Sequence, residues 1–184
     1  MDPAEYRAVR TDRRRAMMAA KRQRRMEVGP HCTFYFENYD TMWHQVHEML
    51  YIENGGEDQI ADELAAYNPL IPNGRELVAT VMFEIEDDGH RARVLARLGG
   101  VEETFAIEID GQVIRGVAET DVDRTTADGK ASSVQFVHFP FDAAQIDAFR
   151  TPEARVVLSV GHENYRHMAV MPEAVRAALA EDFD

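Results

Sequence analysis

The sequence predicts an α+β fold, in which an N-terminal helical segment packs on a mainly antiparallel five- or six-stranded sheet with two or three further helices. Two observations predict this class. Before about residue 68, apolar residues recur mostly at the helical spacing i, i+3, i+4 and i+7. From Glu76 onward they alternate along short segments that are separated by turn residues, which is the period of strands.

Charge and pattern together divide the chain into a basic helical arm, residues 1–25, and a single α+β domain, residues 26–184. The helical part of that domain spans 37–68 and its sheet part spans 75–184. The arm holds nine basic and three acidic residues, a net charge of +6, which leaves −19 on the rest of the chain against −13 for the whole. Such an arm can bind nucleic acid, an acidic partner or the acidic body itself. Nucleic acid is the least favoured of the three, because the acidic body repels phosphate.

The helices of the first part are predicted from caps and stripes. Asp2 followed by Pro3 is typical of a helix start, and a thin apolar stripe continues to about residue 22. Residues 32–36 alternate as a strand, after which Asn38 or Asp40 can cap a second helix. The apolar stripe of that helix consists of Met42, Trp43, Val46, Met49 and Leu50. A third helix begins near residue 57 and stops before Pro69.

The sheet part is predicted from alternation and turns. Strands are expected over 77–85, 105–109, 113–117, 134–139 and 156–160, with 166–170 pairing back. Asp110-Gly111 predicts a two-residue hairpin turn. The polar stretch 120–133 predicts a long loop, and loops of that length are often functional. The order of strands and helices also allows a split βαβ arrangement.

Two polar clusters are candidate sites. On the second helix, His44, His47 and Glu48 share one face, and two imidazoles with a carboxylate can hold a divalent metal. Their order, H-x-x-H-E, differs from the H-E-x-x-H of zinc peptidases, and a solvated helix face is the better supported alternative. The second cluster is His138, His162, Glu163 and His167, for which hydrogen-bonded histidines and a surface turn are likewise the better supported alternative.

The stretch FENYDTMWHQVHEML and the loop YNPLIP at 67–72 carry a resemblance to a family. They resemble the uncharacterised bacterial family DUF3501, and the similarity runs over most of the chain. The family has no established activity, but its genes often lie beside those for a rubrerythrin and an iron–sulfur oxidoreductase, which implies a role in redox stress. In the family pattern positions 44 and 47 are more often Tyr and Gln. Glu37, Glu48 and Glu53 fit the pattern, so the resemblance implies that any shared site is built on these carboxylates.

Two functional hypotheses follow. In the first, the protein is a cytosolic accessory protein that docks a redox partner, either rubrerythrin or an iron–sulfur oxidoreductase; its docking residues are Arg13, Arg14, Arg15, Pro69, Leu70 and Ile71. The apolar loop that contains the last three can instead plug the core. In the second, it is a metal-dependent enzyme that binds iron, manganese or zinc. The ligands would be Glu37, Glu48 and Glu53 with His138 or His162. We prefer docking.

Several classes of function are excluded or disfavoured. The single cysteine, Cys32, excludes an internal disulfide and an iron–sulfur cluster held by this chain alone. No apolar run approaches the roughly 20 residues of a membrane helix, and the N-terminus is too charged for a signal peptide, so we expect a cytoplasmic protein. Phosphate-binding glycine loops and the G-x-S-x-G motif are absent. Oligomeric state and substrate stay open.

Overall fold

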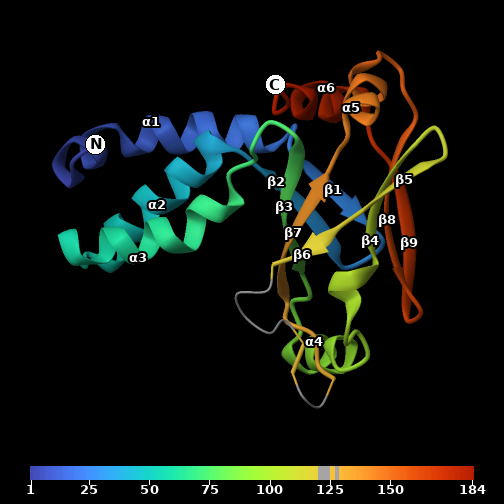
Figure 1. Cartoon of the computed structure of the whole chain (residues 1–184). Coiled ribbons are helices and arrows are strands. Elements are labelled where there is room, and N and C mark those ends of the chain that lie inside the picture. Colours follow the sequence, from blue (N-terminus) through green and yellow to red (C-terminus); the bar gives the residue numbers. More distant parts are fainter. Residues whose placement is uncertain (120–124, 127–128) are drawn as a thin grey trace.

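The computed structural model describes residues 1–119, 125–126 and 129–184. It consists of a β-sandwich and three helices that project from one side of it (Figure 1). We call these three helices the three-helix arm: α1 (Pro3–Lys21), α2 (Tyr39–Glu53) and α3 (Glu57–Tyr67). The remaining helical segments are α4 (Asp88–Leu95), α5 (Ala143–Arg150), α6 (Glu173–Ala180) and the short 3-10 turns η1 (Asn68–Leu70) and η2 (Val101–Thr104). None of the described helices is both long and apolar enough to cross a membrane.

The sandwich contains two antiparallel sheets. The first has the order β1 (Arg25–Val28), β2 (Cys32–Glu37), β3 (Glu76–Phe83), β7 (Val134–Pro140), β6 (Val117–Ala118). The second has the order β5 (Gln112–Arg115), β4 (Phe105–Ile109), β8 (Val156–His162), β9 (Tyr165–Val170). The predicted α+β class and antiparallel pairing are confirmed. The strands divide between two sheets instead of forming one, and no parallel βαβ unit occurs among the described strands.

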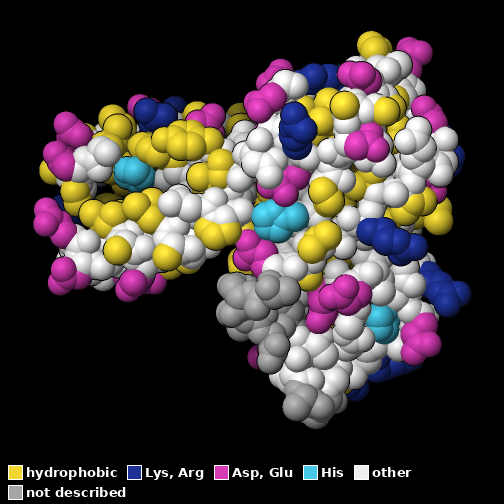
Figure 2. Space-filling model, in the orientation of Figure 1, with side chains coloured by type: hydrophobic (Ala, Val, Ile, Leu, Met, Phe, Trp, Pro, Cys, Tyr) yellow, Lys and Arg dark blue, Asp and Glu magenta, His cyan; other side chains and the backbone are white. Residues whose placement is uncertain are grey.

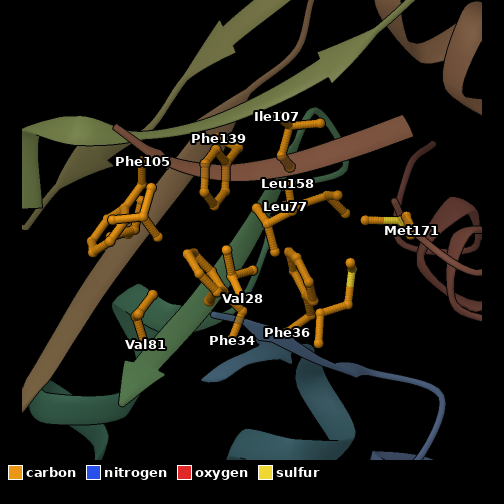
Figure 3. Close-up of a cluster of buried hydrophobic side chains, with 14 of the residues drawn as sticks. Val28, Phe34, Phe36, Leu77, Val81, Phe105, Ile107, Phe139, Leu158 and Met171 are labelled. Carbon is orange, nitrogen blue, oxygen red and sulfur yellow. The ribbon is translucent and has the colours of Figure 1, made fainter. Parts of the chain in front are cut away.

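The main core lies between the two sheets. Phe34 and Phe36 of β2 face Ile107 of β4 and Leu158 of β8 (Figure 3), and all four are buried. Each sheet has one apolar face, and stacking the two faces removes both from water. The chain passes from the second sheet to the first at Gly116, where a Cβ atom would lie 2.6 Å from a methyl carbon of Val137. Only glycine permits so close an approach.

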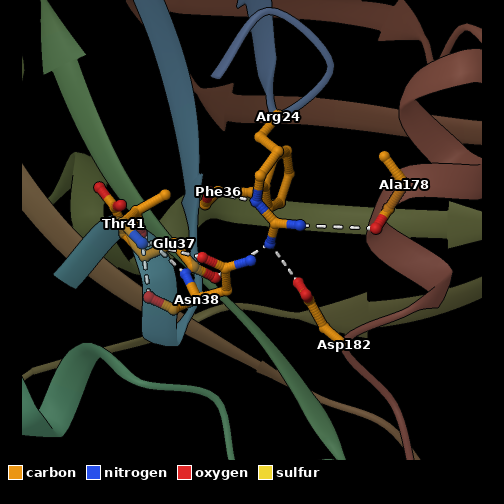
Figure 4. Close-up of polar contacts among 7 residues, drawn as sticks. All are labelled: Arg24, Phe36, Glu37, Asn38, Thr41, Ala178 and Asp182. Carbon is orange, nitrogen blue, oxygen red and sulfur yellow. Dashed lines mark hydrogen bonds and ion pairs between the residues drawn. The ribbon is translucent and has the colours of Figure 1, made fainter. Parts of the chain in front are cut away.

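A buried arginine fixes the corner at which β2 turns into α2 (Figure 4). The guanidinium of Arg24 donates hydrogen bonds to the carbonyl oxygens of Phe36 and Glu37, each over 3.1 Å. It also forms an ion pair with Asp182, in the C-terminal segment after α6. Five guanidinium N–H groups can satisfy several acceptors at once, so one side chain joins the end of β2 to the C-terminus.

The caps of the three-helix arm agree with the sequence. The side chain of Asp2 accepts hydrogen bonds from the first-turn amides of α1, and Asn38 does the same for α2. The residue Asn54 ends α2 in the left-handed conformation. Where the arm meets the first sheet, Leu70 is only 1% exposed and forms a second, small core with Met42 of α2 and Val78 of β3. The loop at 69–72 therefore plugs the core, which is one of the two roles that its sequence allows.

The predicted long loop at 120–133 is described only in part. Residues 120–124 and 127–128 lie outside the described residues. Within the described part, Thr125 pairs with Ala131 in an isolated antiparallel bridge, and the hydroxyl of Thr125 donates to Glu102 over 2.7 Å.

Candidate functional site

Glu48 lies between α1 and α2, where α1 occupies both of its oxygens. The hydroxyl of Tyr6 and the Nε of Arg10 each donate to Oε1 over 2.8 Å, and Nη2 of Arg10 donates to Oε2 over 2.8 Å. The Nε of Arg14 is 3.9 Å from Oε2. The hydrogen bond from Arg10 is the main reason that the pKa of Glu48 is lowered, and it outweighs the opposing effect of burial. The basic helix thus binds the protein's own acidic body, one of the three options its charge allows.

Aromatic rings of α2 complete this contact. The guanidinium of Arg10 lies 4.2 Å from the centre of the Tyr51 ring, and that of Arg13 lies 5.0 Å from the centre of Trp43. Nδ1 of His44 is 3.3 Å from the Tyr6 hydroxyl, and the pKa of His44 is lowered, chiefly because burial disfavours the charged ring. The polar face of α2 is therefore occupied by α1, and Glu48 has no oxygen free for a metal.

The other predicted metal ligands lie in separate surroundings. Glu53 is exposed at the end of α2 and accepts a hydrogen bond from Gln59 over 2.7 Å. Nε2 of His162, at the end of β8, is 3.2 Å from the carbonyl oxygen of Gly99. These two side chains are each engaged within their own segment of the fold, and neither is hydrogen-bonded to another predicted ligand.

His138 stands between two carboxylates of the first sheet. Its Nδ1 is 3.0 Å from Oε2 of Glu76, and its Nε2 is 3.2 Å from Oε1 of Glu119. Both ring nitrogens therefore have a partner. Across the described residues, no group of three or more His, Cys, Asp or Glu side chains is arranged to hold a metal ion. The predicted metal ligands are not brought together, and the metal hypothesis stays a prediction without geometric support.

A groove on the three-helix arm offers a different kind of site. It runs between α1 and α2, has a volume of about 340 Å³, and its apolar wall consists of Met17, Met18, Met49 and Ile52. We call it the methionine groove. Arg14 and Lys21 line it as well. Figure 2 shows hydrophobic side chains gathered along the arm, with acidic side chains at its far end. Methionine side chains are flexible and polarisable, and they suit surfaces that adapt to a partner.

The predicted docking residues divide between surface and core. Arg13, Arg14 and Arg15 are exposed on α1, where Arg15 contacts Asp12 over 3.4 Å. Pro69 is exposed, but Leu70 is buried and Ile71 packs against the same small core. Leu70 and Ile71 thus pack in the joint between the arm and the first sheet, and of the three predicted docking residues of this loop only Pro69 is exposed.

Glu37 points into a cavity on the outer face of the first sheet, beside the arm. Its side chain is on the opposite face of β2 from the core residue Phe36, because successive strand residues alternate. Glu37 is only 4% exposed, and its Oε1 accepts a hydrogen bond from the Thr80 hydroxyl over 2.8 Å. Its Oε2 is buried, and no described residue donates a hydrogen bond to it. The cavity has a volume of about 370 Å³.

Two comparisons with known proteins agree with each other. Residues 1–183 match the model of a family described as "Protein of unknown function (DUF3501)". The chain belongs to the DUF3501 family. It is also similar to the crystal structure of a novel protein of unknown function from Burkholderia pseudomallei, with 33% identity and a TM-score of 0.92. That match covers 100% of this chain and 96% of the other. No curated protein matches the sequence.

In this DUF3501 protein, several residues that build the two surfaces were missed by the sequence analysis. Tyr6 and Arg10, the partners of Glu48, are separated from it by about forty residues of sequence. Thr80 and Phe136 line the cavity from neighbouring strands. One signal was available: Thr80 lies on the non-core face of the predicted strand 77–85, as a polar residue among apolar ones. The partner strands that place it beside Glu37 could not be read from periodicity.

Proposed function

We propose that this DUF3501 protein is an accessory protein that docks a redox partner, and that the methionine groove is the docking surface. The observation that carries the proposal is a groove lined by methionines, with two cationic side chains along it, on an arm that projects from the body. Grooves between helices commonly receive the apolar face of an amphipathic helix. The family resemblance supplies the class of partner, a rubrerythrin or an iron–sulfur oxidoreductase.

Charge selects the kind of segment that the groove would accept. Arg14 and Lys21 favour an acidic segment, because opposite charges across an interface accelerate association and fix orientation. The rest of the chain is acidic and repels acidic surfaces, so binding would be confined to the basic side of the arm. The occupant we propose is therefore an amphipathic helix of the partner with acidic residues along its polar face.

The test is a direct binding measurement with purified rubrerythrin and purified iron–sulfur oxidoreductase from the same organism. Met18 is 63% exposed in the groove, and Met18→Glu places a negative charge where the acidic segment would lie. Val113→Glu is the matched control, because Val113 is 53% exposed on β5 of the sandwich, far from the groove. We expect Met18→Glu to weaken binding by about tenfold or more and Val113→Glu to leave it unchanged.

Salt supplies a second readout. Binding by this surface should weaken as the ionic strength rises, because exposed charges are screened beyond about 10 Å at 0.1 M salt. Equal affinity of the wild-type and Met18→Glu proteins would overturn the assignment of the groove. The docking function would be overturned if neither redox protein binds at a concentration of about 100 μM, because most transient complexes have a Kd below that concentration.

A further inference from the structure

The cavity around Glu37 is a second site, next to the methionine groove and different in chemistry. Its floor is the outer face of the first sheet, where strand register places Tyr35, Thr80 and Phe136 side by side on three neighbouring strands. On the other side, the cavity is covered by residues of the three-helix arm and of the turn η1 that follows α3. These residues are Lys21, Met42, Gln45, Tyr67 and Leu70. Lys21 and Gln45 line both this cavity and the methionine groove.

Oε2 of Glu37 is buried without a hydrogen-bond donor among the described residues. A buried carboxylate oxygen without a donor is costly, and native proteins rarely leave one unsatisfied. Here one oxygen is bonded to Thr80, the backbone of Glu37 is held by Arg24, and the second oxygen is left without a described donor. Thr80 thus holds one oxygen of the carboxylate and Arg24 holds the backbone of the same residue, while Glu37 lines the cavity with its other oxygen unpaired among the described residues.

The lining residues distinguish between three possible occupants of the cavity: a metal ion, water and a small organic molecule. A metal ion would need several oxygen or nitrogen ligands, and the described residues offer no such group. Water would fit beside the polar side chains, but it would leave the apolar wall formed by Met42, Met82 and Val134 in contact with solvent, which is unfavourable. Apolar walls with a few fixed polar groups are typical of sites for small organic molecules.

The aromatic rings that line the cavity indicate the chemical class of the ligand. Tyr35, Tyr67 and Phe136 all line the cavity. Aromatic faces attract cations, and a carboxylate among aromatic rings is the composition that binds organic ammonium groups. Gln45 and Tyr67, which are joined by a hydrogen bond of 3.4 Å, add polar groups on the arm side. Lys21 would favour a ligand whose other end is neutral or acidic, because a second cationic group would be repelled.

We propose that this cavity binds a small organic amine, with its protonated nitrogen donating to the carboxylate of Glu37 and its apolar body against Phe136, Met42 and Met82. The protonated amine would complete the hydrogen bonding of the carboxylate and neutralise its charge. The proposal does not depend on docking at the methionine groove, because its key residues, Glu37 and Thr80, belong to the sheet.

The probe is 2-phenylethylamine, and its uncharged analogue 2-phenylethanol is the control ligand. Binding is followed through the 13C-labelled methyl groups of the methionines, because Met42 and Met82 line the cavity. Met18 in the groove and Met168, 73% exposed on β9, report binding elsewhere. A ligand of this size typically binds with a Kd on the order of 1 mM, so the titration extends to about 10 mM.

We expect the amine to shift the Met42 and Met82 signals and to leave those of Met18 and Met168 unchanged. Glu37→Gln keeps the shape of the side chain but removes its charge, and should weaken amine binding about tenfold or more without changing binding of the alcohol. Val134→Phe narrows the cavity while keeping Glu37, and should weaken the binding of both ligands. It also serves as the test if Glu37→Gln fails to fold.

Three results would overturn the proposal. The first is the absence of Met42 and Met82 shifts at 10 mM amine. The second is equal amine affinity in the wild type and in folded Glu37→Gln. The third is unchanged binding in Val134→Phe. The outcome is independent of the docking test, because Met18→Glu leaves the cavity intact and should bind the amine as the wild type does.

Discussion

The sandwich and the three-helix arm are stabilised in different ways. In the sandwich, apolar residues of both sheets form one continuous buried cluster that includes Phe34, Phe105 and Leu158. In the arm, α1 buries only Tyr6, α2 buries Thr41, Met42 and Val46, and α3 buries no residue. The contacts between α1 and α2 are instead mainly hydrogen bonds, an ion pair and cation–π pairs around Glu48.

This difference assigns separate roles to the two regions. Apolar burial contributes most of the free energy of folding, so the sandwich is the stable scaffold. A region with few buried apolar contacts opens more readily, and binding surfaces are commonly drawn from such regions. Both sites proposed above lie on the arm or where it meets the first sheet. The following predictions test whether the two regions differ in stability as the contacts indicate.

The largest effect is expected in the sandwich. Phe34→Ala removes a fully buried ring and should lower the free energy of unfolding by about 4 kcal/mol, through lost burial and the cavity left behind. Urea denaturation followed by circular dichroism measures it. Tyr39→Ala, at a position 62% exposed on the arm, is the control and should cost much less. Similar losses for the two variants would contradict the assignment of the scaffold to the sandwich.

The joint between the regions should come next. Leu70→Ala opens the small core that it shares with Met42 and Val78, and should cost about 3 kcal/mol. Because this core joins α2 to the first sheet, hydrogen exchange should accelerate in α2 more than in β8. Leu70→Met, which conserves most of the volume, should have a small effect. Uniform acceleration across both elements would show that the arm does not move independently.

A smaller effect is expected within the arm. Tyr6→Phe removes the hydroxyl that donates to Glu48 while keeping the buried ring, and should cost about 1 kcal/mol. Hydrogen exchange of α1 measures it, with the sandwich amides as the internal reference. If α1 exchanges at the wild-type rate, the hydrogen bond does not hold the helix in place.

Acidification should loosen the arm in two steps. The pKa of His44 is lowered from 6.5, mainly by burial. His44 therefore binds a proton more readily when the arm has opened than when it is packed, and the stability of the arm falls as the pH drops below about 6.5. The pKa of Glu48 is lowered from 4.5 mainly by Arg10, so its contribution is present above pH 4.5 and is lost as the pH falls through the lowered value. Tyr6 and Arg14 face both groups, Arg10 faces Glu48, and Lys21 and His47 act on His44.

Fluorescence of Trp43, the single tryptophan, follows this loosening on α2. The ring of His47 stacks on the Trp43 ring, with 3.9 Å between the ring centres, so the measurement is made in a His47→Gln background that removes this contact. Glu48→Gln should remove the step below pH 4.5, and His44→Asn should remove the one below 6.5. If both variants keep both fluorescence steps, groups other than Glu48 and His44 cause the loosening.

The sequence predicted much of the fold and little of either site. The caps at Asp2 and Asn38, the alternation of β2 and β3, and the Asp110-Gly111 turn are local signals, and each element formed as they indicate. Glu37 and Glu48 were singled out by the family resemblance, and both have distinctive surroundings. Their partners could not be predicted, because Tyr6 and Thr80 reach them only through the packing of α1 on α2 and of β2 on β3.

By itself, the sequence determined the class of fold, the approximate positions of most of its elements and the basic character of the first helix, because these depend on local periodicity, caps and composition. The predicted strand 113–117 was wrong, because the chain leaves one sheet and enters the other at Gly116. The tertiary structure alone decided that the strands form two sheets, that α1 occupies Glu48, and that Glu37, with its second oxygen unpaired among the described residues, lines a cavity between the arm and the first sheet. These depend on which distant segments pair and in which register, and a shift of one residue would turn Glu37 into the core.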